Sequence, residues 1–175
     1  ARHRHAHGAR GRDDPSWRER LVRAAADAGE RVRERPKGLG IGARRALAGI
    51  RDLITRTASF TPAQQQTILA ALAVFEPGRK IRFRSSTNVE DSEQFTGAGL
   101  YDSFSGCLAD DLDDDTTGPS HCDPGEPNER GVFRALQRVY ASFYNDNAWL
   151  ERLRFGLNED EVGMAQGVSG REARF

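Results

Sequence analysis

Helical periodicity dominates the first half of the chain. Ser16 can cap a helix that runs to about Arg35, and a second helix is expected from about Ala43 to Ala58. A third helix follows Thr61-Pro62, a cap residue followed by proline at the first helical position. The apolar positions that define these helices are Trp17, Leu21, Ala24, Ala25, Ala28 and Val32, then Leu47, Ile50 and Ile54, then Ile68, Leu69, Leu72 and Phe75. Residues 16–78 are therefore predicted to be a helical segment.

The pattern changes to the alternation of a β-strand at residues 80–86, where charged and apolar residues take turns. Two further strands are expected at 100–108 and 161–166. Between them the spacing predicts a long helix over about 128–144 and a short helix that ends at Gly156. The predicted fold class is α+β, with a helical N-terminal part and a small sheet that packs with a long helix.

Other stretches lack apolar periodicity. Residues 1–15 are expected to form a disordered tail, although the alternating His3, His5 and His7 leave a metal-binding tract as the less favoured interpretation. Residues 85–99 are polar and punctuated by glycine, so they are expected to form a loop.

The stretch from residue 109 to 127 contains six aspartates and three prolines. We expect it to be an exposed and mobile surface excursion. The two cysteines, Cys107 and Cys122, are too few for a disulfide framework. Together with His121 they could meet at a metal ion, but the spacing is loose and this interpretation is not favoured.

Charge is distributed unevenly, although the formal net charge is zero. Residues 1–84 carry a net charge of +11 and residues 85–175 a net charge of −11. The basic half could meet an anion such as a nucleotide. Nucleic acid is a disfavoured partner, because the arginines lie all round the predicted helices and aromatic residues are almost absent there. No apolar run approaches the ~20 residues of a membrane span and no signal-peptide pattern opens the chain, so we expect a cytoplasmic protein with no membrane partner.

The densest set of chemistry-bearing residues follows the first strand. That strand delivers Arg84 to the start of a loop, and Ser85 and Ser86 follow at once. Gly97 and Gly99 allow backbone N–H groups to approach an anion with no Cβ in the way. An arginine fork, hydroxyl donors and bare amides suit a polyphosphate. The alternative is a polar hairpin whose arginine pairs with a nearby carboxylate.

Two weaker candidates lie on either side of this set. Glu90 and Asp91 could hold a magnesium ion through water, or could cap the next turn. Residues 37–42 are rich in glycine and could cradle a phosphate, but no strong strand precedes them, and a plain linker is favoured.

The same residues belong to a longer run that resembles a known family. Arg84-Ser-Ser-Thr-Asn-Val-Glu-Asp91 and Gly97-Ala-Gly-Leu-Tyr-Asp-Ser-Phe104 are similar to the signature of the ATP-binding, or PEP/pyruvate-binding, domain. Pyruvate, phosphate dikinase, phosphoenolpyruvate synthase, glucan water dikinase and rifampicin phosphotransferase share this domain. Residues 135–143 and 162–165 resemble the family's next helix and strand, so the resemblance covers about residues 79–165.

The resemblance implies an ATP-grasp-like nucleotide-binding domain that takes ATP with Mg²⁺. In such a domain Arg84 would contact the ATP phosphates, and the loop Gly97–Ser103 would close over them through its backbone. The β-phosphate would then pass to a histidine on a separate swivelling domain, with release of AMP and phosphate. The nucleotide-binding residues that the resemblance implies are Arg84, Ser85, Ser86, Gly97, Gly99, Asp102 and Ser103.

The chain also departs from the family pattern. Lys37 is the only candidate for the family's early lysine, and its spacing is too short. The acidic residues and the Gln-x-Arg segment that complete the family's site would come after residue 165, and no swivelling-domain histidine motif is present. The segment between Gly97 and Asp102 is two residues longer here than the usual loop of the family. We therefore expect 79–175 to be a partial ATP-binding domain that is truncated at its C-terminal end.

The sequence is compatible with two functions. The first is the ATP-binding part of a dikinase-type phosphotransferase, a kinase by family. It is expected to be inactive alone, because phosphoryl transfer needs charge neutralisation from both walls of a cleft. Its partner would then be the missing remainder of the same protein. The second is a non-catalytic nucleotide- or polyanion-binding module that docks on a partner chain. We also expect the apolar stripe of the long helix, Val132, Leu136, Val139 and Phe143, to be partly uncovered.

Overall fold

The computed structural model describes residues 20, 23, 38–89, 91–92, 95–97, 99–113 and 115–170. The expected tail at 1–15, almost all of the expected first helix, Lys37 and Glu90 lie outside the described residues. The elements in chain order are α2 (Ile41–Asp52), the π-helical turn η1 (Leu53–Thr57), α3 (Pro62–Leu72), β1 (Lys80–Thr87), β2 (Asp91–Ser92), β3 (Phe95–Thr96), β4 (Phe104–Cys107), the 3₁₀ turn η2 (Ala109–Asp111), α4 (Val132–Ser142), α5 (Asp146–Arg154) and β5 (Met164–Gly170).

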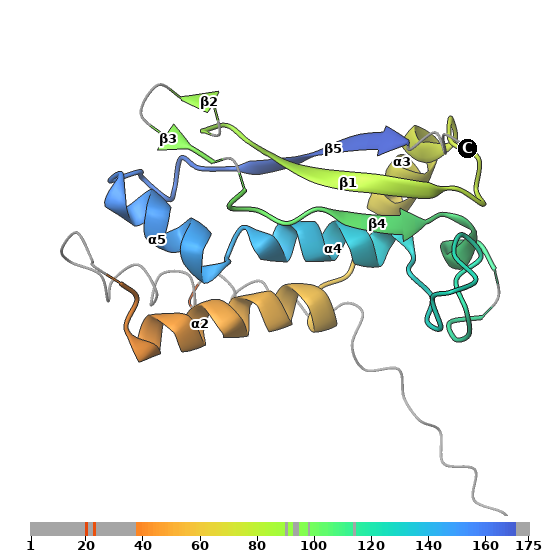
Figure 1. Cartoon of the computed structure of the whole chain (residues 1–175), viewed down its shortest axis with the longest axis horizontal. Helices are drawn as coiled ribbons and strands as arrows, with labels where there is room; N and C mark the ends of the chain where they lie inside the picture. The colour runs from red at the N-terminus through yellow and green to blue at the C-terminus, as the bar shows by residue number, and fades with distance from the viewer. Residues whose placement is uncertain are drawn as a thin grey trace, which may run out of the picture.

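A three-stranded antiparallel sheet has the strand order β4-β1-β5, with β1 in the middle. Figure 1 shows these strands side by side, with α4 running along the sheet and α2 on the far side of α4. The strands β2 and β3, of two residues each, pair with one another as a separate hairpin that follows β1 in the chain. The predicted α+β class is confirmed.

The core lies between the sheet and α4. Ile81 and Phe83 alternate with exposed or half-buried residues along β1, and both are fully buried. They pack against the apolar stripe of α4, together with Leu72 of α3. The expectation that this stripe would be partly uncovered is wrong, because the sheet and the helices around it leave at most 8% of any stripe residue exposed: Val132 0%, Leu136 7%, Val139 0% and Phe143 8%.

The second and third expected helices form close to where the sequence predicts them. Thr61 and Gln64 make a reciprocal capping box that starts α3. The expected helix through Ala58 is confirmed, but its last turn is π-helical, with the Ala58 N–H donating to the Leu53 carbonyl at 2.8 Å. Leu47 and Ile50 of α2 pack on Trp149 of α5.

In the second half of the chain, tertiary contacts place several ends of strands and helices away from their predicted positions. β5 runs to Gly170 because every residue from Met164 onward pairs with the central strand β1. β4 is shorter than predicted and begins only at Phe104. α4 begins at Val132 rather than near 128, because the backbone N–H of Val132 donates to the carboxylate of Asp111 and fixes the first turn there.

Much of the aspartate-rich stretch is exposed, as its composition predicts, but specific contacts anchor it in a way that the composition does not. A disulfide joins Cys107 to Cys122, so these sulfurs are not metal ligands. Asp110 and Ser120 are buried, with 5% and 4% of each residue exposed. The Asp110 carboxylate accepts the backbone N–H groups of His121 and Arg130, each at 2.8 Å. The disulfide ties the stretch to β4, and Asp110 links its beginning to His121 and to the segment before α4.

Candidate functional site

Arg84 lies on the face of the sheet that points away from α4. Its neighbours in sequence alternate in burial as expected for a strand, with Phe83 buried and Arg84 and Ser86 exposed. Arg82 lies on the same face and is half-buried. Among the described residues, neither Arg82 nor Arg84 has an ion-pair partner. We call this surface of Arg82, Arg84 and Ser86 the outer face.

The residues that flank Arg84 on the outer face are small. Arg84 is paired in register with Gly167, and Ser86 with Ala165, and both of these β5 residues are exposed. A Cβ placed on Gly167 would meet nothing within 4 Å. Because the described β5 residues beside Arg84 are a glycine and an alanine, they leave room for a flat or branched anion to approach its guanidinium.

The glycine loop, which we define as residues 97–103, enters β4 next to Arg84. Phe104 pairs with Phe83, so Ser103 and Arg84 each lie one residue beyond the last pair of the ladder. The Leu100 N–H donates to the Gly97 carbonyl at 3.1 Å and closes a turn. Gly99, at the third position of that turn, has φ +80°, which favours glycine over any residue with a side chain.

Aromatic contacts fix both ends of the glycine loop. Phe95, just before it, is 1% exposed and meets the Phe155 ring edge-on, with 5.5 Å between ring centroids. Tyr101, inside it, stacks on Phe143 of α4 at 6.1 Å with 8° between the ring planes. The Tyr101 hydroxyl accepts a hydrogen bond from the buried Arg152 of α5 at 3.3 Å.

Asp102 has a structural partner. Its carboxylate accepts a hydrogen bond of 3.0 Å from the side-chain amide of Asn145, which precedes α5. The side chain is otherwise exposed. Asp102 therefore holds the end of the glycine loop against the α4–α5 junction, in addition to any contact that it makes with a ligand.

The other predicted site residues do not all lie on the outer face. The alternation of β1 puts Ser85 on the helix side of the sheet, opposite to Arg84 and Ser86, so its hydroxyl does not share the outer face. Gly97 is buried, and Gly99 and half-buried Ser103 reach the surface. Asp91 begins β2, but its side chain, like all of Glu90, lies outside what the structure describes.

An acidic cluster of Asp113, Asp115 and Glu129 lies at the opposite end of β1. One ligand atom from each residue falls within 4.8 Å of the others. The hydrogen bond that the Glu129 carboxyl donates to Asp115 is the main cause that raises the pKa of Glu129 to about 7. The cluster follows Cys107 in the chain, and Cys107 pairs with Lys80 at the start of β1. Lys80 is four residues from Arg84, which is roughly 13 Å along the strand. A cation held there would not neutralise phosphates bound at Arg84.

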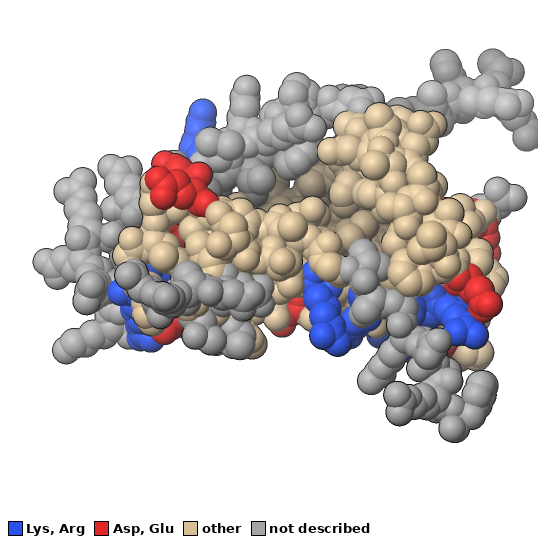
Figure 2. All heavy atoms as spheres, turned by 90° about the horizontal axis from the view of Figure 1, so that it is seen from above, with Lys and Arg blue, Asp and Glu red and all other residues tan. Residues whose placement is uncertain are grey.

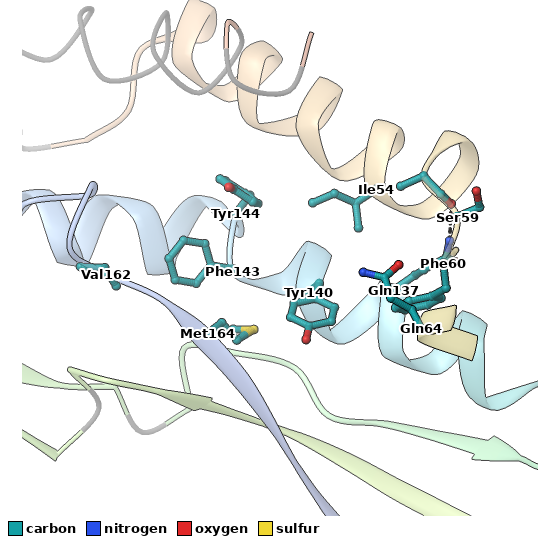
Figure 3. A pocket seen from close by; sticks show the side chains of 11 residues that line it. Ile54, Ser59, Phe60, Gln64, Gln137, Tyr140, Phe143, Tyr144, Val162 and Met164 are labelled. Carbon is teal, nitrogen blue, oxygen red and sulfur yellow. Dashed lines mark hydrogen bonds between the residues drawn. The ribbon is translucent and has the colours of Figure 1, made fainter. Parts of the chain in front are cut away.

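A cavity of about 370 Å³ lies on the helix side of the sheet. Figure 3 shows Ile54 facing it from η1, Tyr140 and Phe143 from α4, and Val162 and Met164 from the side of β5. None of the residues that line it is charged, so a polyphosphate would lose its hydration there without gaining a counter-ion. This cavity is therefore not the candidate anion site.

A second hollow of about 310 Å³ runs along the free edge of β4 and is lined by three arginines of the α4 region. Arg130 is neutralised by Glu126. Arg138 lies over the Phe104 ring, 4.2 Å from its centroid. In Figure 2, most of the visible Lys and Arg side chains lie along the lower border, whereas an acidic group and one basic side chain are visible at the upper left.

No known family model matches the chain, and no curated protein matches it. In the described part of the chain, none of the helices has the length and apolar character needed to cross a membrane. The case for a function therefore depends on the site geometry and on the sequence resemblance.

Sequence reasoning missed three residues that shape this site. Arg152, Tyr101 and Asn145 were not among the predicted site residues, yet they bind or fix the glycine loop. One signal was present for Arg152, which stands one helical turn after Trp149 and next to Leu153, within the apolar side of the short helix. Tyr101 is 51 residues from Arg152, and Asn145 is 43 residues from Asp102. No local sequence pattern can reveal contacts over such separations.

Proposed function

We propose that this chain is the ATP-binding part of a dikinase-type phosphotransferase, with an ATP-grasp-like fold, and that Arg84 and the glycine loop bind the ATP phosphates. The observation that carries the proposal is the placement of Arg84. It is exposed and has no ion-pair partner among the described residues, beside a β5 glycine with open space above it and a turn that contains Gly99. The resemblance of residues 84–104 to the dikinase signature gives this anion site its identity as a nucleotide site.

The donors fit phosphate better than they fit magnesium. Arg82 and Arg84 supply cationic forks and Ser86 a hydroxyl, all on one face. The described acidic cluster stands at the far end of β1, so Mg²⁺ would come with the ATP phosphates and neutralise part of their charge. Phosphoryl transfer to a histidine carrier would need further residues opposite the outer face.

The alternative function is a non-catalytic nucleotide- or polyanion-binding module that docks on a partner chain. The outer face would serve it equally well, since affinity for a polyphosphate requires donors but not a complete catalytic set. The two functions differ in whether the chain turns over ATP and in whether the adenine base of ATP adds to the binding affinity. A module for polyanions binds tripolyphosphate as well as ATP, whereas a nucleotide domain prefers ATP.

Calorimetry with Mg-ATP and with magnesium tripolyphosphate tests the proposal on the wild-type chain, Arg84→Ala and Arg45→Ala. Arg45 is an exposed arginine on α2, on the other side of α4, so its removal controls for the loss of one positive charge. Losing the charged donor at Arg84 should cost about 1.5–3 kcal/mol of binding free energy. Arg45→Ala should bind like the wild type.

Equal affinity of Arg84→Ala and the wild type would exclude the outer face as the phosphate site. Equal affinity of the wild type for ATP and tripolyphosphate, lost in Arg84→Ala, would favour the polyanion module over the kinase part.

A further inference from the structure

Arg152 is the largest side chain that the described fold buries completely. None of its surface is exposed. Its Nε and Nη2 donate to the two carboxylate oxygens of Glu159 at 2.8 and 3.1 Å. Its Nη1 donates to the Phe143 carbonyl at 3.0 Å and to the Tyr101 hydroxyl at 3.3 Å. Every arm of the guanidinium therefore has a fixed partner.

The surroundings hold this cation in one orientation. The guanidinium carbon lies 3.9 Å from the centroid of the Phe143 ring and 5.3 Å from that of Trp149. A buried ion pair adds little net stability compared with apolar residues of the same volume, because both charges lose their hydration. The specific geometry of Arg152 therefore points to a role in placing its partners rather than in stabilising the core.

The partners of Arg152 belong to the two segments that border Arg84. Tyr101 lies in the glycine loop, two residues after Gly99, and its ring is fixed by the stack on Phe143. Glu159 lies in the turn that leads to β5. Further along that turn, Asn88 at the end of β1 donates to the Glu161 carbonyl at 2.7 Å and accepts the Gly163 N–H at 2.9 Å.

We infer that Arg152 is a positioning residue that sets the glycine loop relative to the Arg84 strand. It binds the loop through Tyr101 on one side and the approach to β5 through Glu159 on the other. The backbone amides of the loop and the guanidinium of Arg84 are then held at a constant separation before any anion arrives, which lowers the cost of ordering on binding. The importance of this separation for anion binding rests on the proposed function, whereas the positioning itself does not.

Tyr101→Phe is the sharpest variant, because it removes only the hydroxyl that Arg152 binds and leaves the stack on Phe143. Arg152 keeps its bonds to Glu159 and to the Phe143 carbonyl, so the core stays paired. Arg152→Met is a poorer test, because it leaves Glu159 without its cation and can prevent folding. Tyr140→Phe makes the same chemical change on an exposed part of α4 and serves as the matched control.

Two measurements on the full chain follow. The first is the position of the Gly97 and Gly99 amide signals in ¹H–¹⁵N NMR spectra without ligand. The second is the affinity for pyrophosphate by calorimetry. In Tyr101→Phe we expect both amide signals to move and the affinity to fall about threefold to tenfold. Tyr140→Phe should change neither.

Wild-type amide positions in Tyr101→Phe would overturn the inference. If the wild type binds pyrophosphate and the signals move with no loss of affinity, the claim that this separation matters for anion binding is overturned. If the wild type binds no pyrophosphate but the two glycine signals still move in Tyr101→Phe alone, the positioning role stands and the proposed function fails. The two failures are therefore distinguishable.

Discussion

Arg84 of β1 stands directly opposite Gly167 of β5 on the outer face of the sheet. The glycine leaves open space beside the arginine, which a side chain at position 167 would fill. Gly167→Val should therefore lower the affinity for ATP or tripolyphosphate several-fold without removing a donor. Valine suits a strand, so the free energy of unfolding should not fall. Calorimetry and urea unfolding measure the two effects.

Gly49→Val is the matched control for that variant, because Gly49 is exposed on α2, away from the sheet. It should leave anion affinity unchanged. Full affinity in Gly167→Val would show that the space beside Arg84 is not used by the anion.

Asp102 tests whether the glycine loop is held by a hydrogen bond or by a charge. Asp102→Ala removes the acceptor for the Asn145 amide and should lower the free energy of unfolding by about 0.5–1.5 kcal/mol. Asp102→Asn keeps a carbonyl oxygen in place and should stay close to the wild type. Urea unfolding measures both variants. If Asp102→Asn destabilises the chain as much as Asp102→Ala, the charge matters more than the bond.

The disulfide should restrain the aspartate-rich stretch. Cys107 and Cys122 are 15 residues apart, and closing a loop of this size stabilises a fold by about 2–4 kcal/mol. Reduction with a dithiol should therefore lower the midpoint of urea unfolding and speed proteolytic cleavage between residues 109 and 127. Mass spectrometry of the fragments locates the cut. Equal cleavage rates with and without reductant would mean that other contacts, such as those of Asp110, hold the stretch alone.

Stability should decrease as pH rises through the titration of Asp111. Burial raises the pKa of this carboxyl from 3.8 to about 6, against the lowering effect of the Val132 N–H. Between these two values the folded chain keeps a proton that the unfolded chain releases. The free energy of unfolding therefore falls with rising pH in this window and then levels off. Asp111→Asn should flatten the profile.

Asp52→Asn is the control for the pH profile, because Asp52 is an exposed aspartate at the end of α2 that pairs with the exposed Arg56 of η1. Urea unfolding at intervals from pH 4 to 7 gives the three profiles. A profile of Asp111→Asn that is parallel to that of the wild type would place the titration elsewhere.

The chain alone should show no sustained release of AMP from Mg-ATP, with or without pyruvate. The described acidic cluster lies away from Arg84, and no acceptor histidine lies on the outer face within the described residues. Chromatography of the nucleotides detects AMP directly. Sustained AMP formation that Arg84→Ala abolishes would show that this chain contains a complete catalytic set.

Local patterns predicted much of the fold. The Thr61-Pro62 start of α3, the alternation of β1 and the end of α5 at Gly156 follow from capping, strand geometry and a left-handed glycine, and the structure confirms all three. The choice of Arg84 and the glycine loop as the candidate site also came from the sequence. Its use as a nucleotide site stays a prediction.

The sequence by itself determined the helices, the central strand and the position of the candidate anion donors, because these depend on residues within a few positions of one another. Only the tertiary structure decided that Cys107 pairs with Cys122, that β5 extends to Gly170, and that Arg152 binds Tyr101 across 51 residues of chain. Each of these depends on surfaces that meet only after the sheet has formed on α4. A periodicity measured along the chain carries no information about which distant residue a side chain will meet.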